Sequence, residues 1–378
     1  MKILLPFLAI FALLYSFSPP MEKGLKGVDR GIDLRAIYSS GDPSTWPAPH
    51  LFEEAKEGFE DIGALPKATF PKNNPYSKEK EELGKMLFFD PRLSESGQIS
   101  CASCHDPELM WADGRRVAYG HDRQLGIRNT PTLVNIAYAT SLFWDGRAKD
   151  LEDQVKFPIE NPIEMNIHSK LAVKRIAKIK AYRPLFKQAF GEGKITQDKI
   201  DKAIATFERT LLSPPSRFDL FVKGKKDALS DSEVRGLHLF RTKANCINCH
   251  NTSYFSDQKF HNVGLTYFDR EYEDLGLYEI TKNKEDVGKF KTPTLREVSQ
   301  TAPYMHNGLF PTIRGVLNMY NAGMPNEKWK ENGRGISPKK SGMLTELNLS
   351  ESELVDIENF LKSLHSLRYK MRPPELPR

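Results

Sequence analysis

The chain has 378 residues, four cysteines and a formal net charge of +6, and hydrophobic residues make up 39% of it. Its length predicts about two domains of roughly 100 to 200 residues each. All four cysteines belong to two copies of one CxxCH pentapeptide, so a fold held by disulfides is excluded. The positive charge is spread along the chain without a nucleic-acid-binding motif, and we expect no nucleic-acid partner.

The amino terminus has the layout of a secretory signal. Lys2 precedes an apolar run at residues 3–17, and Ser18-Pro19-Pro20 follows it. The run is shorter than the ~20 apolar residues of a membrane span, so a short uncleaved anchor is the alternative. Residues 1–20 therefore predict export to the periplasm.

Residues 21–75 are rich in glycine, proline and charge, with isolated aromatic residues. Such a composition interrupts helices and strands and disfavours a packed domain. We expect an extended arm that lies on the surface.

Two pentapeptides, CASCH at 101–105 and CINCH at 246–250, use every cysteine. Two thiols on one helical turn can bind the vinyl groups of a haem, and the adjacent histidine can bind its iron. A zinc site or a redox dithiol is the alternative, but neither needs histidine directly after cysteine both times. The motifs predict two covalent haem c groups, with these attachment and iron-ligand residues: Cys101, Cys104, His105, Cys246, Cys249 and His250.

The chain repeats itself around the two motifs. Similar helical segments precede them at 82–88 and 234–240, and similar segments follow at 129–133 and 291–295. Aligning Thr132 with Thr294 also places residues 144–146 on 306–308 without a gap. This pattern predicts two homologous cytochrome c domains, at 76–229 and 230–378.

The elements of both domains are expected to be helical. Apolar residues at helical spacing run from Ile200 to Leu211 and stop before Pro214-Pro215. Capping-box patterns at 230–233 and 350–353 begin two further helices. The predicted fold class is all-α, with the extended arm in front of the two domains.

The remaining iron position of the first haem has one candidate in the sequence. His121 lies in a turn-rich stretch at 119–122, where a loop can carry a ligand onto the iron and off it. A solvated loop histidine is the alternative, and spacing alone does not separate the two.

An ordered set of further motifs accompanies the two pentapeptides and His121. The set consists of the segments 128–132 (RNTPT), 143–147 (FWDGR), 151–154 (LEDQ), 161–165 (NPIEM), 260–264 (FHNVG) and 302–308 (APYMHNG). Over about residues 75 to 370 the chain resembles the bacterial diheme cytochrome c peroxidase family, including relatives that oxidise protein tryptophans.

This resemblance implies roles for residues of the first domain. The haem held by His105 would react with peroxide, Glu164 would move protons and Gln154 would orient peroxide or carboxylate. From the residues alone Glu160 competes with Glu164. Trp144 would relay electrons between the haems, and a buried structural tryptophan is its alternative. His121 matches a histidine that caps the peroxidatic iron until the other haem is reduced.

The second haem departs from the best-known peroxidases, which place methionine on the iron. Counting from His306 puts Tyr320 at that position, with Met324 as the alternative. Methionine raises a haem potential, whereas a phenolate stabilises ferric iron and lowers the potential. Tyrosine resembles the protein-oxidising branch, whereas His121 matches the capped peroxidases, so the sequence mixes features of both.

The resemblance also implies a calcium ion between the domains, held by oxygens of Asn129, Thr301 and Pro303. Ordinary turn chemistry explains these residue types equally well. His306 resembles a residue near the haem propionates and is not expected to bind iron.

The predicted function is a diheme cytochrome c peroxidase that reduces hydrogen peroxide with electrons from a small periplasmic cytochrome or cupredoxin. A basic group between Lys170 and Lys180 is a candidate docking site for such an acidic donor. The alternatives are a diheme enzyme that oxidises tryptophan or other residues of a partner protein through high-valent iron, and a non-catalytic electron carrier. The family also makes a homodimer possible.

Overall fold

The computed structural model describes residues 33–327, 329, 333–366 and 371–378. Residues 34–378 form one compact unit. The predicted signal segment, residues 1–20, lies outside the described residues. No helix in the described part of the chain is both long enough and apolar enough to cross a membrane.

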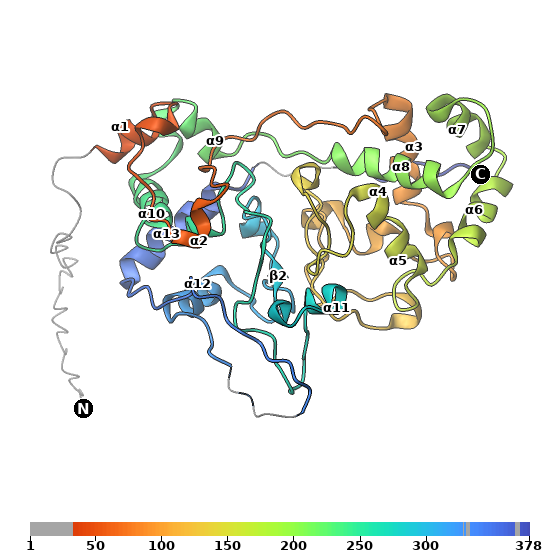
Figure 1. Cartoon of the computed structure of the whole chain (residues 1–378). Helices are drawn as coiled ribbons and strands as arrows, with labels where there is room; N and C mark the ends of the chain where they lie inside the picture. Colours follow the sequence, from red (N-terminus) through yellow and green to blue (C-terminus); the bar gives the residue numbers. More distant parts are fainter. Residues whose placement is uncertain (1–32, 328, 330–332, 367–370) are drawn as a thin grey trace, which may run out of the picture. The chain divides into compact units, whose positions relative to one another are not determined.

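The described chain is rich in helix and has little sheet, as predicted (Figure 1). Strand β1 (Phe260–His261) pairs with β2 (Phe290–Lys291) in antiparallel register, with Phe260 opposite Lys291. The α-helices are α1 (Leu34–Tyr38), α2 (Glu53–Lys56), α3 (Lys78–Phe88), α4 (Leu151–Gln154), α5 (Lys156–Glu160), α6 (Ser169–Lys178), α7 (Tyr182–Phe190), α8 (Gln197–Arg209), α9 (Arg217–Val222), α10 (Asp231–Arg241), α11 (Tyr278–Thr281), α12 (Ile313–Asn321) and α13 (Glu351–Ser363).

The predicted helix starts are confirmed by their caps. Ser230 accepts a hydrogen bond from the Glu233 amide while Glu233 reaches back to the Ser230 amide, and Ser350 and Glu353 repeat the arrangement. Each box satisfies amide groups that the first helical turn leaves without partners. Helix α8 ends at Arg209, before the proline pair, as expected.

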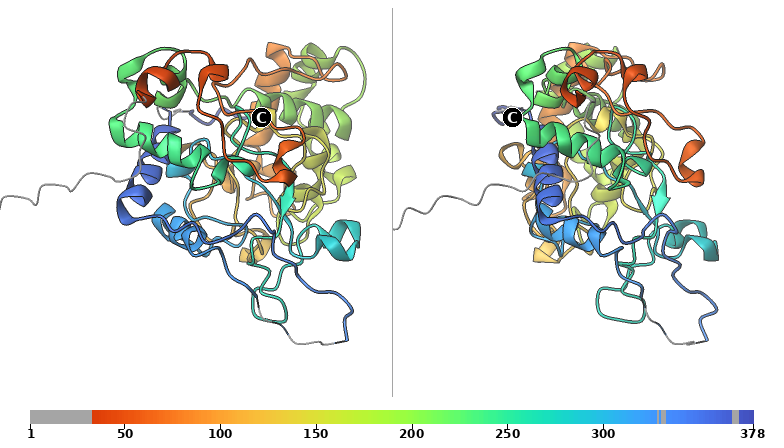
Figure 2. Two further views of the ribbon diagram at one scale, coloured as in Figure 1. Left: turned by 60° about the vertical axis from the view of Figure 1, so that its left-hand side comes forward. Right: turned by 90° about the vertical axis from the view of Figure 1, so that its left-hand side faces the viewer.

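Two helix pairs form the centres of two hydrophobic cores, α3 with α8 and α10 with α13. Both pairs cross at a glycine. A Cβ on Gly84 would lie 1.9 Å from the carbonyl oxygen of Ala203, and one on Gly236 would lie 2.0 Å from that of Asp356. The green α10 and the blue α13 lie side by side in every view (Figure 2). A side chain at either crossing would push the two helices apart.

An aromatic cluster lies between each crossing and a CxxCH motif: Phe88 is near the His105 ring, and the Phe255 carbonyl is bonded to His250. Phe88, Trp111 and Phe207 pack edge to face with ring centroids 5.3 to 5.8 Å apart. In the second core Phe240, Phe255 and Phe360 pack with centroids 5.3 to 6.3 Å apart. Edge-to-face packing of this kind adds to the stabilisation that burial alone provides.

The amino-terminal segment is only partly the surface arm that its composition predicts. Tyr38, Trp46 and Ile62 are buried in the core around α10 and α13. The buried guanidinium of Arg241 fixes the segment, because it pairs with Asp61 and donates to the Tyr38 hydroxyl. The sequence pattern missed this anchoring because a few widely spaced aromatic and aliphatic residues suffice when the partner surface is preformed.

The chain passes from one core to the other near Pro214-Pro215. The side chains of Phe218, Phe221 and Leu229 belong to the core around α10 and α13, although the predicted boundary at residues 229 and 230 leaves them in the first domain. The division into two domains stays a prediction, and packing favours a passage earlier in the chain. Met371 packs back against the first core.

Candidate functional site: two haem sites and the seam between them

The second CxxCH motif opens onto a large, mainly apolar cavity. Cys246–Asn248 form a short 3-10 turn, and His250 Nδ1 donates to the carbonyl oxygen of Phe255 at 3.0 Å. Both thiols and the His250 ring line the cavity. Because Nδ1 is occupied, Nε2 is the nitrogen left to bind a metal, as in most haem proteins with a proximal histidine.

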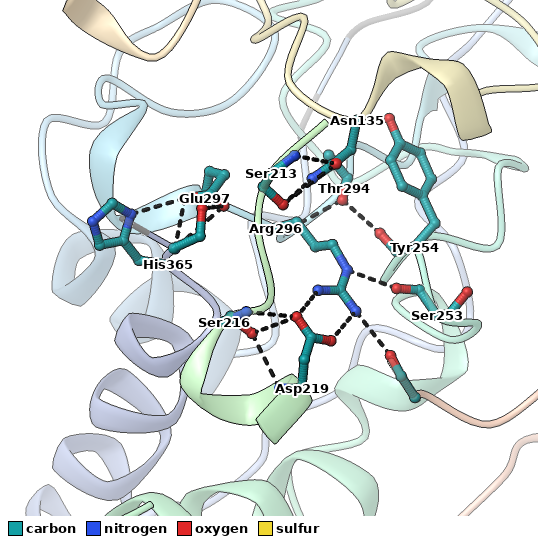
Figure 3. A network of polar contacts seen from close by, with 12 residues as sticks. Asn135, Ser213, Ser216, Asp219, Ser253, Tyr254, Thr294, Arg296, Glu297 and His365 are labelled. Carbon is teal, nitrogen blue, oxygen red and sulfur yellow. Dashed lines mark hydrogen bonds and ion pairs between the residues drawn. The ribbon is translucent and has the colours of Figure 1, made fainter. Parts of the chain in front are cut away.

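A buried arginine fixes the loop that carries Phe255. Arg296 donates to both carboxylate oxygens of Asp219 at 3.0 Å, to the carbonyl of Ser253 at 2.7 Å and to that of Gly63 at 2.8 Å (Figure 3). Its guanidinium also lies over the Phe255 ring. The loop behind His250 is therefore held jointly by α9, the amino-terminal segment and the haem motif itself.

Tyr320, on α12, lines this cavity together with His250. Burial raises the pKa of its hydroxyl, and the neighbouring Cys249 and Cys246 thiols raise it further. Met324 follows α12 in a left-handed conformation and is not among the residues that line the cavity, whereas Met343 is. The geometry favours Tyr320 over Met324 and adds Met305 and Met343, which also line the cavity, as candidates that the sequence analysis missed.

The first CxxCH motif has the same local construction. Cys101–Ser103 form a 3-10 turn, and Ser100 and Ser103 cap it reciprocally. His105 Nδ1 donates to the carbonyl oxygen of Trp111 at 2.9 Å. Nε2 of His105 is again the nitrogen left for a metal.

The two motifs fit covalent haem c. None of the four cysteines is joined in a disulfide, and burial raises the pKa of every thiol, to about 12 for Cys104 and Cys246. In both motifs the second cysteine directly precedes a histidine whose Nδ1 is held by a backbone carbonyl, which is the arrangement that covalent haem attachment requires. Cys249, Asp257 and His261 do lie within 4.8 Å of one another, but His261 is paired with Asp257 at 2.8 Å.

His121 lies beside the segment that carries Glu164. Its amide donates to the carbonyl oxygen of Glu164 at 2.8 Å, and its Nδ1 is buried without a hydrogen-bond partner among the described residues. Glycine is required at position 120, because a Cβ there would lie 1.9 Å from the carbonyl oxygen of Ile163. The structure thus brings the predicted capping histidine and the predicted acid–base residue together.

The two competing glutamates have different surroundings. Glu164 Oε1 accepts a hydrogen bond of 2.7 Å from the Asn161 side chain, and burial raises its pKa although Asn161 and Arg147 oppose the shift. Its charge also acts on the thiols of Cys101 and Cys104. Glu160 is exposed and caps α6 by accepting from the Ser169 amide at 3.0 Å.

Gln154 is the last residue of α4 and is partly buried. The described residues provide no hydrogen bond to its side chain. Its predicted role at the first haem therefore stays a prediction.

Trp144 lies at a seam where the two halves exchange hydrogen bonds. The Asn129 amide donates to the His306 carbonyl at 2.7 Å, and the Lys291 amide donates to the Trp144 carbonyl at 2.8 Å. In the repeat alignment Lys291 corresponds to Asn129 and His306 to Trp144, so the two contacts are the same contact made in both directions. Reciprocity of this kind is the signature of a two-fold interface.

Aromatic rings fill the seam. Trp144 Nε1 donates to the Asn129 carbonyl at 2.9 Å, and its ring centroid is 6.4 Å from that of His306. His306 stacks on Phe290 at 3.6 Å. Burial lowers the pKa of His306 to about 3, so this ring stays neutral at physiological pH.

A buried ionic network closes the seam. Arg128 pairs with Asp274 through bonds of 2.7 and 2.8 Å and also contacts Asp145, which accepts from Arg147 as well. Burial opposes the charge on Arg128, but its two carboxylate partners raise its pKa. Because Asp274 belongs to the second half, this network joins residues of both halves at the seam.

The three predicted calcium residues, Asn129, Thr301 and Pro303, line the cavity of the second haem site. The Asn129 side-chain nitrogen donates to the Arg115 carbonyl at 2.8 Å. This bond uses the side-chain nitrogen of Asn129 and leaves its side-chain oxygen for another partner. Calcium stays a prediction.

Comparison with known proteins identifies the family. A model described as di-haem cytochrome c peroxidase matches residues 78–227. The chain is 38% identical to methylamine utilization protein MauG of Methylophilus methylotrophus, over 85% of this chain and 92% of that protein. This chain belongs to the di-haem cytochrome c peroxidase family.

Other members of the family agree with this assignment. The chain is 34% identical to cytochrome c551 peroxidase of Pseudomonas aeruginosa, over 87% of this chain and 90% of that one. A solved structure of a MauG-like protein associated with microbial copper homeostasis has a TM-score of 0.73 at 33% identity and covers 80% of this chain and 93% of its own. The predicted family, haem-peroxidase class and pair of c-type haems are confirmed.

Sequence reasoning missed several residues of these sites. Glu208 had a detectable signal, because it continues the apolar stripe of α8 one turn after Ile204. The pairing of Arg128 with Asp274 and the position of Met343 at the cavity of the second haem site had no signal in the sequence, because both depend on contacts between distant segments.

Proposed function

We propose that this protein reduces hydrogen peroxide to water at the haem held by His105, with Glu164 as the group that moves protons. The observation that carries the proposal is the placement of Glu164, a partly buried carboxyl oriented by Asn161 beside the attachment cysteines. The haems supply the redox chemistry. A carboxylate there can take the proton from one peroxide oxygen and return it to the other, which contributes roughly 10² to 10⁴ in rate.

His121 would control access to this site. Its short turn includes Asp122 and Arg123 in left-handed conformations, at φ 51° and 58°. Non-glycine residues in that region are strained. The Nδ1 of His121, which is buried without a hydrogen-bond partner among the described residues, adds a further energetic cost. We infer that the loop has a second position, in which His121 leaves room for peroxide.

The test replaces Glu164 by glutamine in the haem-loaded protein, with Glu160→Gln as the matched control. The expected result is a loss of peroxide turnover of at least 100-fold for Glu164→Gln and little change for Glu160→Gln, because Glu160 is exposed and caps α6. Both variants should keep two haems and wild-type electron uptake. Full peroxidase activity in Glu164→Gln would overturn the assignment.

The second candidate function is oxidation of tryptophan or other residues in a partner protein. Tyr320 in the second cavity favours it, because an oxygen ligand stabilises ferric iron. Mixing the diferric protein with peroxide separates the two functions. Reaction without prior reduction supports the protein-oxidising branch, whereas reaction only after one-electron reduction supports a capped peroxidase.

The electron donor is proposed to be a small acidic cytochrome or cupredoxin. Lys170, Lys174, Lys178 and Lys180 are exposed on and after α6, whereas Arg175 donates to the Ser94 carbonyl and belongs to the fold. Complementary charge chiefly speeds encounter. Reversing Lys174 and Lys178 to glutamate should slow reduction by an acidic donor and weaken its salt dependence.

Further proposals follow from the family and the repeat. They are export to the periplasm, calcium at Asn129, Thr301 and Pro303, descent of the two halves from one duplicated haem domain, and assembly as a homodimer. The reciprocal hydrogen bonds at the seam support the duplication. A chelator that lowers the melting temperature, reversed by added calcium, would support the metal site.

A further inference from the structure

A buried carboxyl near the first haem site has no role in the function above. Glu208, on α8, is 4% exposed, and its Oε2 has no hydrogen-bond partner among the described residues. Its neighbour Arg209 directs both guanidinium nitrogens to Glu152, at 2.7 and 2.6 Å. A buried polar atom without a partner is costly and calls for an explanation.

Glu208 lies on the side of α8 that meets the first haem motif. Burial is the main reason why the pKa of the Cys101 thiol is raised, and the charge of Glu208 makes the next largest contribution. Phe207, the residue before it, packs against Phe88 and Trp111, and the Trp111 carbonyl holds His105.

The second half provides an independent check. Gly84 meets the Cβ of Phe207 across the α3–α8 crossing, as Gly236 meets that of Phe360 across the α10–α13 crossing. Glu208 therefore corresponds to Leu361, the residue after Phe360. Leu361 lines the cavity of the second haem site. Position 208 therefore corresponds to a position that lines the cavity of the second haem site, and it holds a carboxyl where the other half has leucine.

We propose that Glu208 is a proton-binding site coupled to the first haem: at a pH where its carboxyl is ionised, it takes up one proton when that haem gains an electron and releases the proton when the electron leaves. The iron gains one electron and the carboxylate one proton, so the net charge of the buried site does not change. The proposal rests on the haem assigned to the first site and not on its peroxidase activity.

The physical reason is electrostatic. An electron added to a dry site raises the affinity of a nearby carboxylate for protons, and by linkage the proton raises the affinity for the electron. Burial raises the pKa of Glu208 to about 8, Arg209 lowers it and Glu152 raises it. The charged groups around this part of α8 are Arg209 and Lys202 on the helix, Glu152 on α4, Lys80 on α3 and Glu164 across the site.

The test is a spectroelectrochemical titration of the haem-loaded full chain between pH 6 and pH 10, following the first haem. In the wild type we expect the reduction equilibrium constant to be constant at low pH and to fall up to tenfold per pH unit above about pH 8. A tenfold change is 59 mV for one electron. In Glu208→Gln this slope should disappear.

Two further variants keep the outcome decisive. Glu208→Leu reproduces the second half and should also remove the slope, which covers the case in which glutamine disturbs haem attachment. Asp201→Asn is the matched control, because Asp201 is a second buried carboxyl on α8 with a raised pKa that is hydrogen-bonded to Gln197. It should keep the wild-type slope. A slope that persists in both Glu208 variants, or is missing from the wild type, overturns the proposal.

Discussion

In the first haem site carboxyl groups act on both cysteines, whereas in the second the one carboxyl that acts on a cysteine, Asp257 beside Cys249, is paired with His261. Glu208 and Glu164 both act on the Cys101 thiol, but no charged side chain perturbs its counterpart Cys246. The two sites nevertheless share the glycine crossing, the aromatic cluster and the histidine held by a carbonyl oxygen. The two sites thus share their local construction and differ in the charged side chains that act on their cysteines.

The test of this contrast with the largest expected effect concerns the ligand of the second haem. Replacing Tyr320 by methionine should raise the potential of that haem by on the order of a hundred millivolts or more, since axial ligands set haem potentials over about 0.8 V. Redox titration with optical spectra measures the change. Met343→Leu is the control, and a changed spectrum there would make Met343 the ligand instead of Tyr320.

The second test breaks the support that only the second half has. Arg296 is buried and bidentate, and the residue aligned with it in the first half is Val134. Arg296→Met leaves Asp219 buried and unpaired, so the free energy of unfolding should fall by about 3–5 kcal/mol. Denaturant titration measures the loss. Adding Asp219→Asn should recover part of it, and equal stability of the single and double variants would contradict this account.

The third test compares the two helix crossings directly. Alanine at Gly84 or at Gly236 places a Cβ against a backbone carbonyl, and overpacking of this kind costs about 1–3 kcal/mol. Thermal unfolding should show similar losses for both variants. Gly342→Ala, which meets nothing within 4 Å, should change little. A loss at only one crossing would show that the two pairs are not equivalent.

The final test follows the pH dependence of stability caused by Glu208. The folded chain keeps this proton up to a pKa of about 8, whereas an unfolded glutamate loses it near 4.3. Between these values the folded state binds more protons, so the free energy of unfolding falls as pH rises, by at most about 1.4 kcal/mol per unit. Glu208→Gln should flatten this fall in unfolding curves recorded from pH 5 to pH 8, whereas an unchanged slope would locate the proton elsewhere.

The sequence by itself determined the haem motifs, the helix starts and the family. The cysteine and histidine spacing, the capping boxes at Ser230 and Ser350 and the stripe from Ile200 to Leu211 act within one or two helical turns. Local spacing is visible in a linear chain. For this reason the helix-rich fold, and the similarity of the segments around the two motifs, could be read before any contact was known.

The tertiary structure decided which of several equivalent side chains lies in a site. Glu160 and Glu164 share one segment, yet one caps a helix at the surface and the other lies beside the cysteines. Tyr320 and Met324 are close in sequence, yet only Tyr320 lines the cavity. The buried anchors of the amino-terminal segment and the burial of Glu208 likewise depend on distant partners. Burial and pKa arise from segments far apart in sequence packing together, and local periodicity carries no record of that packing.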